Sequence, residues 1–194
     1  MMENKIKFAP NVMLIDASYL DRVTCDLRAH FAPIVNRELP KADLAVLLEC
    51  LALDAGLEPG QHEIQVIFVY DAAHGRMRFC APSDLEKEIH GMAFQSRLGE
   101  FSLYAFQTSG MARREDLFGE SLQLLTESKD VRRVMLVPDE GEYGSVVAEL
   151  AEKMKDKESV TVFGMNPPAH ECSYRFEMLG FAVLQSLGIR AEEL

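Results

Sequence analysis

The 194-residue sequence predicts an α/β protein, a three-layer α/β/α sandwich around a five-stranded, mostly parallel sheet. Two observations predict this class. Five short apolar runs, rich in β-branched and aromatic residues, are bounded by turn signals, as is typical of buried strands. Segments with helical periodicity lie between these runs, and regular alternation of strand and helix is typical of a parallel sheet covered on both faces.

The expected strands are the five apolar runs. They lie at residues 11–15, 64–70, 101–106, 134–137 and 160–163. Numbered along the chain, these strands are expected to adopt the sheet order 3-2-1-4-5, so that the first and fourth strands are neighbours. Open α/β sheets bind ligands at the carboxyl ends of their strands where the strand order reverses, and this order places that switch point between the first and fourth strands.

Five helices are expected from apolar periodicity and from capping residues. They cover residues 41–55, 83–97, 114–128, 143–155 and 171–187. Ser83 and Glu86 form a capping-box pattern at the start of the second helix, and Gly188 is a C-cap for the last one. No linker or internal repeat interrupts the pattern, which predicts a single domain over residues 1–194 that ends in the helix at about 171–187.

Residues 17–40 are the least regular part of the sequence. The stretch 27–33 favours a short helix, but Pro33 and Pro40 limit its length.

The composition restricts the classes of function. Acidic residues outnumber basic ones by 31 to 20, which gives a formal charge of −11. This charge argues against binding of nucleic acid that depends mainly on electrostatic attraction. A local basic strip remains compatible with this charge. The basic residues that could flank a nucleic-acid path are Arg76, Arg78, Arg97, Arg113 and Arg114.

The four cysteines and the apolar content predict where the protein works. The cysteines lie far apart with no CxxC spacing, which is typical of free thiols in a reducing compartment. The N-terminus carries Glu3 without a hydrophobic leader, and no run reaches the roughly 18 apolar residues of a membrane span. We therefore expect a cytoplasmic protein that does not enter a membrane.

Acidic side chains follow several of the expected strands. Asp16 ends the first strand, Asp71 follows the second, and Glu140 and Glu142 follow the fourth. Asp116 lies in the first turn of the helix that precedes the fourth strand. Carboxylates gathered at one sheet edge suit Mg²⁺ or Mn²⁺, which prefer oxygen ligands. Such an ion could orient a water molecule and neutralise the charge that develops on a phosphodiester during hydrolysis.

An ordinary structural role is the alternative for each of these carboxylates. Aspartate at the end of a strand often caps the following turn, and acidic residues in the first turn of a helix complement its dipole. The sequence contains no GxGxxG, GxxxxGK[ST] or GxSxG motif, so the usual signs of dinucleotide, nucleoside triphosphate or serine-hydrolase chemistry are absent from it.

Four segments of the sequence resemble the motifs of NYN domains, members of the PIN-like nuclease superfamily. Residues 15–20 (IDASYL) are similar to the opening motif I-D-G-S-N-L, and residues 113–116 (RRED) to a K-x-V-D segment. Residues 136–143 (LVPDEGEY) are similar to L-V-S-G-D-G-D-F, and residues 160–164 to the following strand, which ends in glycine. The similarity extends in order and spacing over about residues 11–165.

The resemblance implies a PIN-like fold and, in active members, metal-dependent cleavage of RNA. It places Asp16, Asp116, Glu140 and Glu142 at the acidic positions that would hold magnesium or manganese. Asp71, which lies outside these motifs, is a peripheral candidate because it follows the second strand. Three departures bear on activity. Tyr19 replaces the asparagine, Pro138-Asp139 replaces Ser-Gly, and both late aspartates are glutamates. The longer glutamate side chain moves the oxygens by about one bond length, and a near-octahedral magnesium site tolerates little distortion.

Two hypotheses of function follow. The first is a divergent PIN-like or NYN-like ribonuclease, in which Asp16, Asp116, Glu140 and Glu142 bind the metal and one of them positions the attacking water. The second is a catalytically inactive α/β module that binds a protein partner or a small ligand at the same sheet edge. The shared placement of the carboxylates favours the enzyme, whereas the acidic charge and the replaced asparagine and serine favour the module.

Overall fold

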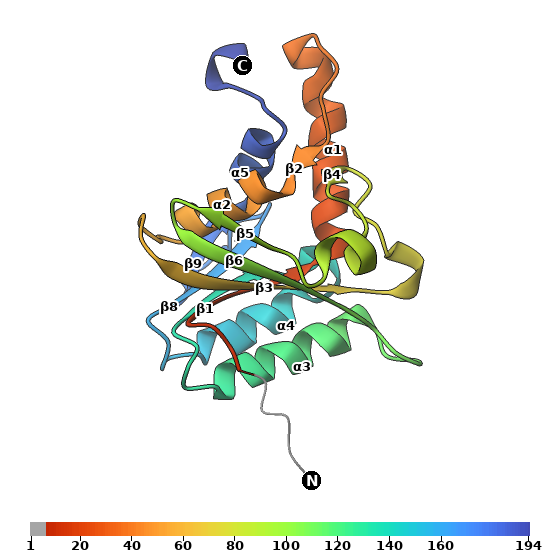
Figure 1. The fold of residues 1–194 in the computed structure, drawn as a ribbon. Helices are drawn as coiled ribbons and strands as arrows, with labels where there is room; N and C mark the ends of the chain where they lie inside the picture. Colours follow the sequence, from red (N-terminus) through yellow and green to blue (C-terminus); the bar gives the residue numbers. More distant parts are fainter. Residues whose placement is uncertain (1–6) are drawn as a thin grey trace.

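The computed structural model describes residues 7–194; residues 1–6, Glu3 among them, lie outside the described residues. The chain forms an α/β fold whose centre is one mostly parallel sheet (Figure 1). Its strands are β1 (Asn11–Asp16), β3 (His62–Tyr70), β5 (Ala93–Ser96), β6 (Gly99–Gln107), β7 (Arg133–Val137), β8 (Ser159–Gly164) and β9 (Arg175–Met178). They adopt the order β5-β6-β3-β1-β7-β8-β9, and only the β5–β6 pair is antiparallel.

Helices cover both faces of this sheet. They are α1 (Ala17–Val35), α2 (Leu44–Asp54), α3 (Arg114–Glu127), α4 (Glu140–Glu152) and α5 (Leu179–Ser186). Figure 1 shows α1, α2 and α5 on one side of the sheet and α3 and α4 on the other. Two short strands, β2 (Ala42–Asp43) and β4 (Cys80–Ala81), pair with each other beside α1.

Alternate residues of the central strands enter two separate cores, as the two-residue period of a strand requires. In β1, Met13 and Ile15 pack with α1, α2 and α5, whereas Val12 and Leu14 pack with α3 and α4. All four side chains are essentially inaccessible to solvent. The position of β1 in the middle of the sheet therefore places its carboxyl end at the middle of the carboxyl edge of the sheet.

The α/β class and the mostly parallel sheet are confirmed, but the sheet has seven strands instead of five, so its full order differs from 3-2-1-4-5. The five expected strands are present as the consecutive neighbours β6-β3-β1-β7-β8. The additional strands, β5 and β9, extend the two edges. Both lie in segments for which the sequence predicts helices.

The expected helix at residues 83–97 is wrong. Only Leu85–Ile89 is helical, as one π-helical turn (η2) capped by Asp84, whose Oδ1 accepts a hydrogen bond from the Lys87 amide at 2.9 Å. Gly91, with φ of +82°, follows directly and turns the chain into β5. A positive φ is readily adopted by glycine and ends a helix, so the helix stops after a single turn. Its cap is Asp84 instead of the expected pair Ser83 and Glu86.

The helix expected at residues 171–187 is shorter than predicted. Residues 175–178 pair in parallel with β8, and helix α5 begins only at Leu179. Gly188, with φ of +76°, follows its end as expected.

Residues 17–40, where the sequence favours only a short helix at 27–33, contain the longest helix of residues 7–194. Helix α1 buries one face through Leu20, Val23 and Thr24 and accommodates Pro33 near its end, where Asn36 closes the helix with φ of +53°. No helix of residues 7–194 combines the length and apolar character needed to span a membrane.

Candidate acidic site at the carboxyl edge of the sheet

Two aspartates at the ends of neighbouring strands form the base of the candidate site. Asp16 ends β1 and Asp139 follows β7, and both side chains are fully buried. Each carboxylate caps the next helix: Asp16 Oδ1 accepts a hydrogen bond from the Tyr19 amide at 3.1 Å, and Asp139 Oδ1 accepts one from the Glu142 amide at 3.3 Å. These caps hold both carboxylates in fixed orientations and satisfy amides that the helices leave unpaired.

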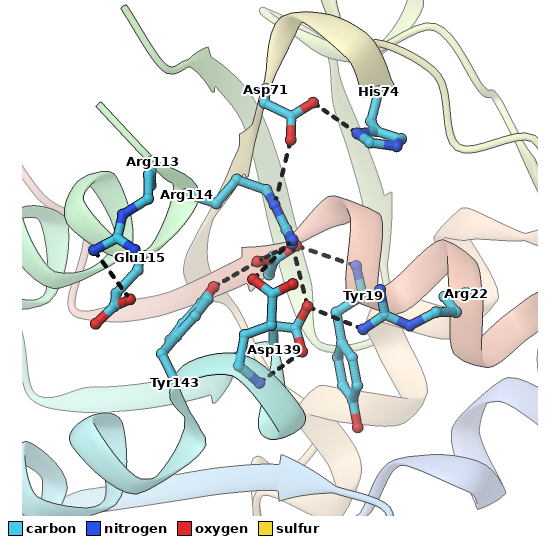
Figure 2. Close-up of polar contacts among 11 residues, drawn as sticks. Tyr19, Arg22, Asp71, His74, Arg113, Arg114, Glu115, Asp139 and Tyr143 are labelled. Carbon is cyan, nitrogen blue, oxygen red and sulfur yellow. Dashed lines mark hydrogen bonds and ion pairs between the residues drawn. The ribbon is translucent and has the colours of Figure 1, made fainter. Parts of the chain in front are cut away.

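The guanidinium of Arg114 lies between these two carboxylates. Arg114 is the first residue of α3, and its side chain extends into the site from the side of that helix (Figure 2). Its Nη1 lies 2.7 Å from each oxygen of Asp16 and 3.3 Å from Asp139 Oδ2. Only 12% of the Arg114 side chain is exposed, so this is a largely buried ion network.

Two further carboxylates and a second guanidinium complete the cluster. Asp71 Oδ2 lies 3.4 Å from Arg114 Nε, and Glu142 Oε2 lies 3.3 Å from Arg114 Nη2. Arg22 of α1 donates a hydrogen bond from Nη2 to Asp139 Oδ2 at 2.9 Å. Arg114 therefore touches four carboxylates that come from three different parts of the chain, and we call these residues together with Arg22 the Arg114 cluster.

The charges in the cluster shift the pKa of Arg114. Burial alone would lower this pKa, but the neighbouring Asp16 carboxylate, with Asp139 and Glu142, raises it above its ordinary value. The guanidinium is therefore positively charged at every pH at which the protein is folded.

Tyr143 is the neutral member of the site. Its hydroxyl donates a hydrogen bond to Asp16 Oδ2 at 2.5 Å (Figure 2). Its ring packs at a tilt against Phe118 of α3. Burial, followed by the charge of Asp16 and this hydrogen bond, raises the pKa of the Tyr143 hydroxyl well above its usual range. The phenol therefore stays protonated and serves as a donor to the buried carboxylate.

Replacing Tyr143 with phenylalanine removes that donor and is expected to cost about 1–3 kcal/mol of stability at neutral pH. The raised pKa also predicts a pH effect. Above pH ~10 the unfolded chain releases the tyrosine proton while the folded protein retains it, so stability falls as the pH rises, and Tyr143→Phe should show a shallower fall. Urea unfolding at pH 7 to 11 measures both effects. Tyr104→Phe is the control at neutral pH, because the Tyr104 hydroxyl makes no hydrogen bond among residues 7–194. Equal stabilities at pH 7 would contradict the assigned hydrogen bond.

The four site residues predicted from the sequence do not converge on one point. Asp16 and Glu142 both contact Arg114. Glu140 instead points toward the end of β8, where Oε2 accepts a hydrogen bond from the Met165 amide at 2.7 Å. Asp116 accepts a hydrogen bond from the Arg113 amide at 2.9 Å and thereby closes the first turn of its own helix. Asp116 thus has the local capping role that was the alternative to metal binding, whereas Glu140 contacts the segment that follows β8.

The residues of the site do not fit a divalent cation. Among residues 7–194, no group of three or more histidine, cysteine, aspartate or glutamate side chains is arranged to hold a metal ion. The space between Asp16 and Asp139, which a cation bridging both carboxylates would need, is taken by Arg114 Nη1. A guanidinium is planar and donates hydrogen bonds along fixed directions, so it satisfies several carboxylate oxygens at once without a metal.

Comparison with known proteins places the chain in a family. A model of a family of unknown function, DUF6621, matches residues 5–194, which is nearly the whole sequence. The chain belongs to the DUF6621 family. No curated protein and no solved structure matches it significantly, and no NYN or PIN family model matches it either.

Sequence reasoning missed four residues of the site in this DUF6621 protein: Arg22 of α1, which it did not single out, and Arg114, Asp139 and Tyr143. Arg114 was noted only as a basic residue that could flank nucleic acid, and Asp139 only as a replacement within the NYN-like motif. Asp139 carries a signal, because an aspartate at the end of a strand with Glu142 three residues later is a capping-box pattern. Tyr143, which follows at once, carries no signal of its own.

A cavity of about 680 Å³ adjoins the Arg114 cluster in the DUF6621 fold. It lies between α1 and the segment that follows β3, and Ser18, Arg22, Tyr70, Arg76 and Arg114 are among the residues that line it. Its volume falls within the range of small-molecule sites in proteins, about 300–1,000 Å³. Arg22 and Arg114 belong to both the cluster and the cavity wall, so a ligand in the cavity would contact the cluster directly.

Proposed function

We propose that this DUF6621 protein is a divergent NYN-like or PIN-like α/β protein that works in the cytoplasm as a binding module, without metal-dependent nuclease activity. Its ligand or partner is recognised at the carboxyl edge of the sheet, where the Arg114 cluster and the adjoining cavity lie. In this proposal Arg114 has taken over the charge neutralisation that a magnesium or manganese ion would perform in an active ribonuclease.

One observation carries the proposal: a buried guanidinium occupies the centre of the acidic group. Arg114 satisfies Asp16 on both oxygens, and Tyr143 and the Tyr19 amide fill the remaining acceptor positions of that carboxylate. A carboxylate with this many donors has little capacity left for a cation. Displacing Arg114 would also break its largely buried ion pairs with Asp16 and Asp139, which is strongly destabilising.

The sequence departures point in the same direction. The Ser-Gly pair of the NYN-like motif is replaced by Pro138-Asp139, and Asp139 supplies a second buried carboxylate to Arg114. The two glutamates at the late aspartate positions have separate contacts, since Glu140 binds the segment that follows β8 and the largely exposed Glu142 pairs with Arg114. These changes support an ion network that stabilises the sheet edge in place of a metal centre.

A manganese titration tests the proposal. A ligand that binds only the native state must stabilise it by RT ln(1 + [L]/Kd). We therefore expect millimolar MnCl₂ or MgCl₂ to leave the melting temperature of the wild-type protein unchanged, and we expect no manganese-dependent cleavage of a single-stranded RNA.

The matched variant is Asp16→Asn, which removes the charge at the centre of the site. Manganese-dependent stabilisation or RNA cleavage in the wild type, lost in Asp16→Asn, would overturn the proposal and favour the ribonuclease. A small manganese shift that is equal in both proteins would come from exposed carboxylates elsewhere and would leave the proposal intact.

A further inference from the structure

The two edge strands of the central sheet differ in charge. Strand β9 reads Arg-Phe-Glu-Met, and its Arg175 and Glu177 form an ion pair of 2.5 Å. Strand β5 reads Ala-Phe-Gln-Ser and carries no charged residue, although the whole chain has a formal charge of −11. Charged side chains on an edge strand hinder its pairing with another chain, so β5 is the edge of this sheet that lacks such protection.

The outer side of β5 presents a row of free backbone groups. A hydrogen bond of 2.8 Å from the Leu103 amide to the Met92 carbonyl oxygen fixes the alternation of the β5–β6 ladder. Every second residue of an antiparallel strand bonds to its neighbour, so Phe94, two residues after Met92, bonds to β6. Ala93 and Gln95 therefore direct their N–H and C=O groups to the other side, where no strand of residues 7–194 lies, and both residues are exposed.

The aromatic ring of Phe94, between these two residues, is only partly covered. It stacks on Phe101 of β6, with the ring centroids 4.7 Å apart and 7° between the planes, and it packs at the margin of the core that contains α1, α2 and α5. The ring remains partly exposed because β5 is the last strand on this side of the described sheet. A strand that paired with β5 would cover it.

We propose that β5 pairs in antiparallel orientation with β5 of a second copy of this chain, so that the two sheets join across a two-fold axis at Phe94. Ala93 then lies opposite Gln95 of the second copy. Each of the two such pairs exchanges two backbone hydrogen bonds, and Phe94 lies opposite Phe94 of the second copy. A two-fold axis brings the same surface of both copies together, and antiparallel pairing of identical strands satisfies this symmetry. The interface lies on an edge strand, so the inference goes beyond the ligand site of the proposed function.

The charges along this interface are compatible with a second copy. Glu100 is the charged residue in the paired parts of β5 and β6, and Gln95 lies beside it and donates a hydrogen bond to it at 3.1 Å. Across the interface, Gln95 is followed by Ala93 and then by Ser102 of the second copy. Like charges directly opposite one another destabilise a strand pair, and this register contains none, whereas facing aromatic residues stabilise it.

Sedimentation velocity over a concentration range of about 5 to 500 µM tests the inference. Paired strands of four residues, with the 53% exposed Met92 beside them, form a small interface, so a weak dimer that dissociates on dilution is expected. Gln95→Pro removes the N–H that points to the second copy and leaves the bonds between Phe94 and β6 in place. It should weaken the dimer by about tenfold or more, because symmetry removes two hydrogen bonds at once.

Gln95→Ala is the matched control. It retains the backbone N–H and loses only the exposed side chain, so its dissociation constant should equal that of the wild type. Far-UV circular dichroism establishes that both variants are folded before their dissociation constants are compared.

Phe94→Cys tests the register and does not depend on the proline variant. Opposite residues at a non-hydrogen-bonded position of an antiparallel pair have Cα atoms about 4.5 Å apart, within the range that a disulfide bridges. Under mild oxidation this variant should form a covalent dimer at least about tenfold faster than Gln95→Cys, whose introduced sulfur would face Ala93 and not its own counterpart. The wild type, with its four free cysteines, gives the background rate.

A chain that remains monomeric over the whole concentration range would overturn the inference and leave the β5 edge to a strand of another protein. A dimer that Gln95→Pro leaves as tight as the wild type would also overturn it, because the copies would then meet on another surface. Faster cross-linking of Gln95→Cys than of Phe94→Cys would reject the register. None of these results bears on the proposed function, which the manganese titration tests separately.

Discussion

Replacing Arg114 with methionine is expected to lower the free energy of unfolding by about 3–5 kcal/mol, the usual cost of removing one partner of a buried ion pair. Methionine retains much of the length and apolar surface of the arginine stem but none of its charge. The variant leaves Asp16 and Asp139 buried with their negative charges no longer neutralised by Arg114. Urea unfolding at pH 7, followed by far-UV circular dichroism, measures the change.

Arg113→Met is the matched control for this prediction. Arg113 is the adjacent residue, but 75% of its side chain is exposed and its ion pairs with Glu115 and Asp116 are 3.8 and 3.9 Å long. Exposed pairs of this kind contribute about 0–1 kcal/mol, so the control should remain close to the wild type. If Arg114→Met were as mild as Arg113→Met, the Arg114 cluster would not be the stabilising network described here.

The double variant Arg114→Met/Asp16→Asn shows whether the loss comes from an unpaired charge. Asparagine retains an oxygen that can cap α1 but has no charge to be neutralised. The double variant is therefore expected to be more stable than Arg114→Met alone, and its comparison with both single variants and the wild type measures how strongly the two sites are coupled. Purely additive effects would mean that Arg114 acts through packing instead of charge.

The position of the site was predictable, but its central residue was not. The apolar runs that end in Asp16 and Val137 define two buried parallel strands, and general rules for α/β sheets place the ligand site where they end. Nothing in the local pattern distinguishes Arg114 from Arg113. Only the path of α3 across the sheet decides which of the two side chains reaches the buried carboxylates, and that path depends on tertiary packing.

The two missed strands have a common physical cause. Strand β9 reads Arg-Phe-Glu-Met and strand β5 reads Ala-Phe-Gln-Ser, so neither forms a continuous apolar run. Both lie at an edge of the sheet, where one side of the strand has no neighbour and the side chains are only partly buried. The continuous apolar run that identifies a fully buried strand therefore predicts the central strands of such a sheet and does not predict its edge strands.

The largest effect expected away from the site is at Gly99, where β6 begins. Gly99 has φ of +124°, a backbone conformation that L side chains rarely adopt. A Cβ atom here would lie 2.0 Å from the carbonyl oxygen and 2.5 Å from the amide nitrogen of His62, the first residue of β3. These are backbone atoms, which cannot rotate away as a side chain does, so the start of β6 would have to separate from β3.

We therefore expect Gly99→Ala to destabilise the protein by about 3 kcal/mol or more, from the strained φ and the steric overlap together. Gly119→Ala is the control. No heavy atom lies within 4 Å of the Cβ it would add, and alanine in a helix is favoured over glycine by about 1 kcal/mol. Urea unfolding should give opposite signs for the two substitutions. Hydrogen exchange should locate the damage of Gly99→Ala in the β3–β6 pair and in the β5–β6 hairpin, because both pairings begin at this residue. A stability within about 0.5 kcal/mol of the wild type would contradict the close approach of β6 to His62, since no relaxation confined to side chains relieves a contact between two backbones.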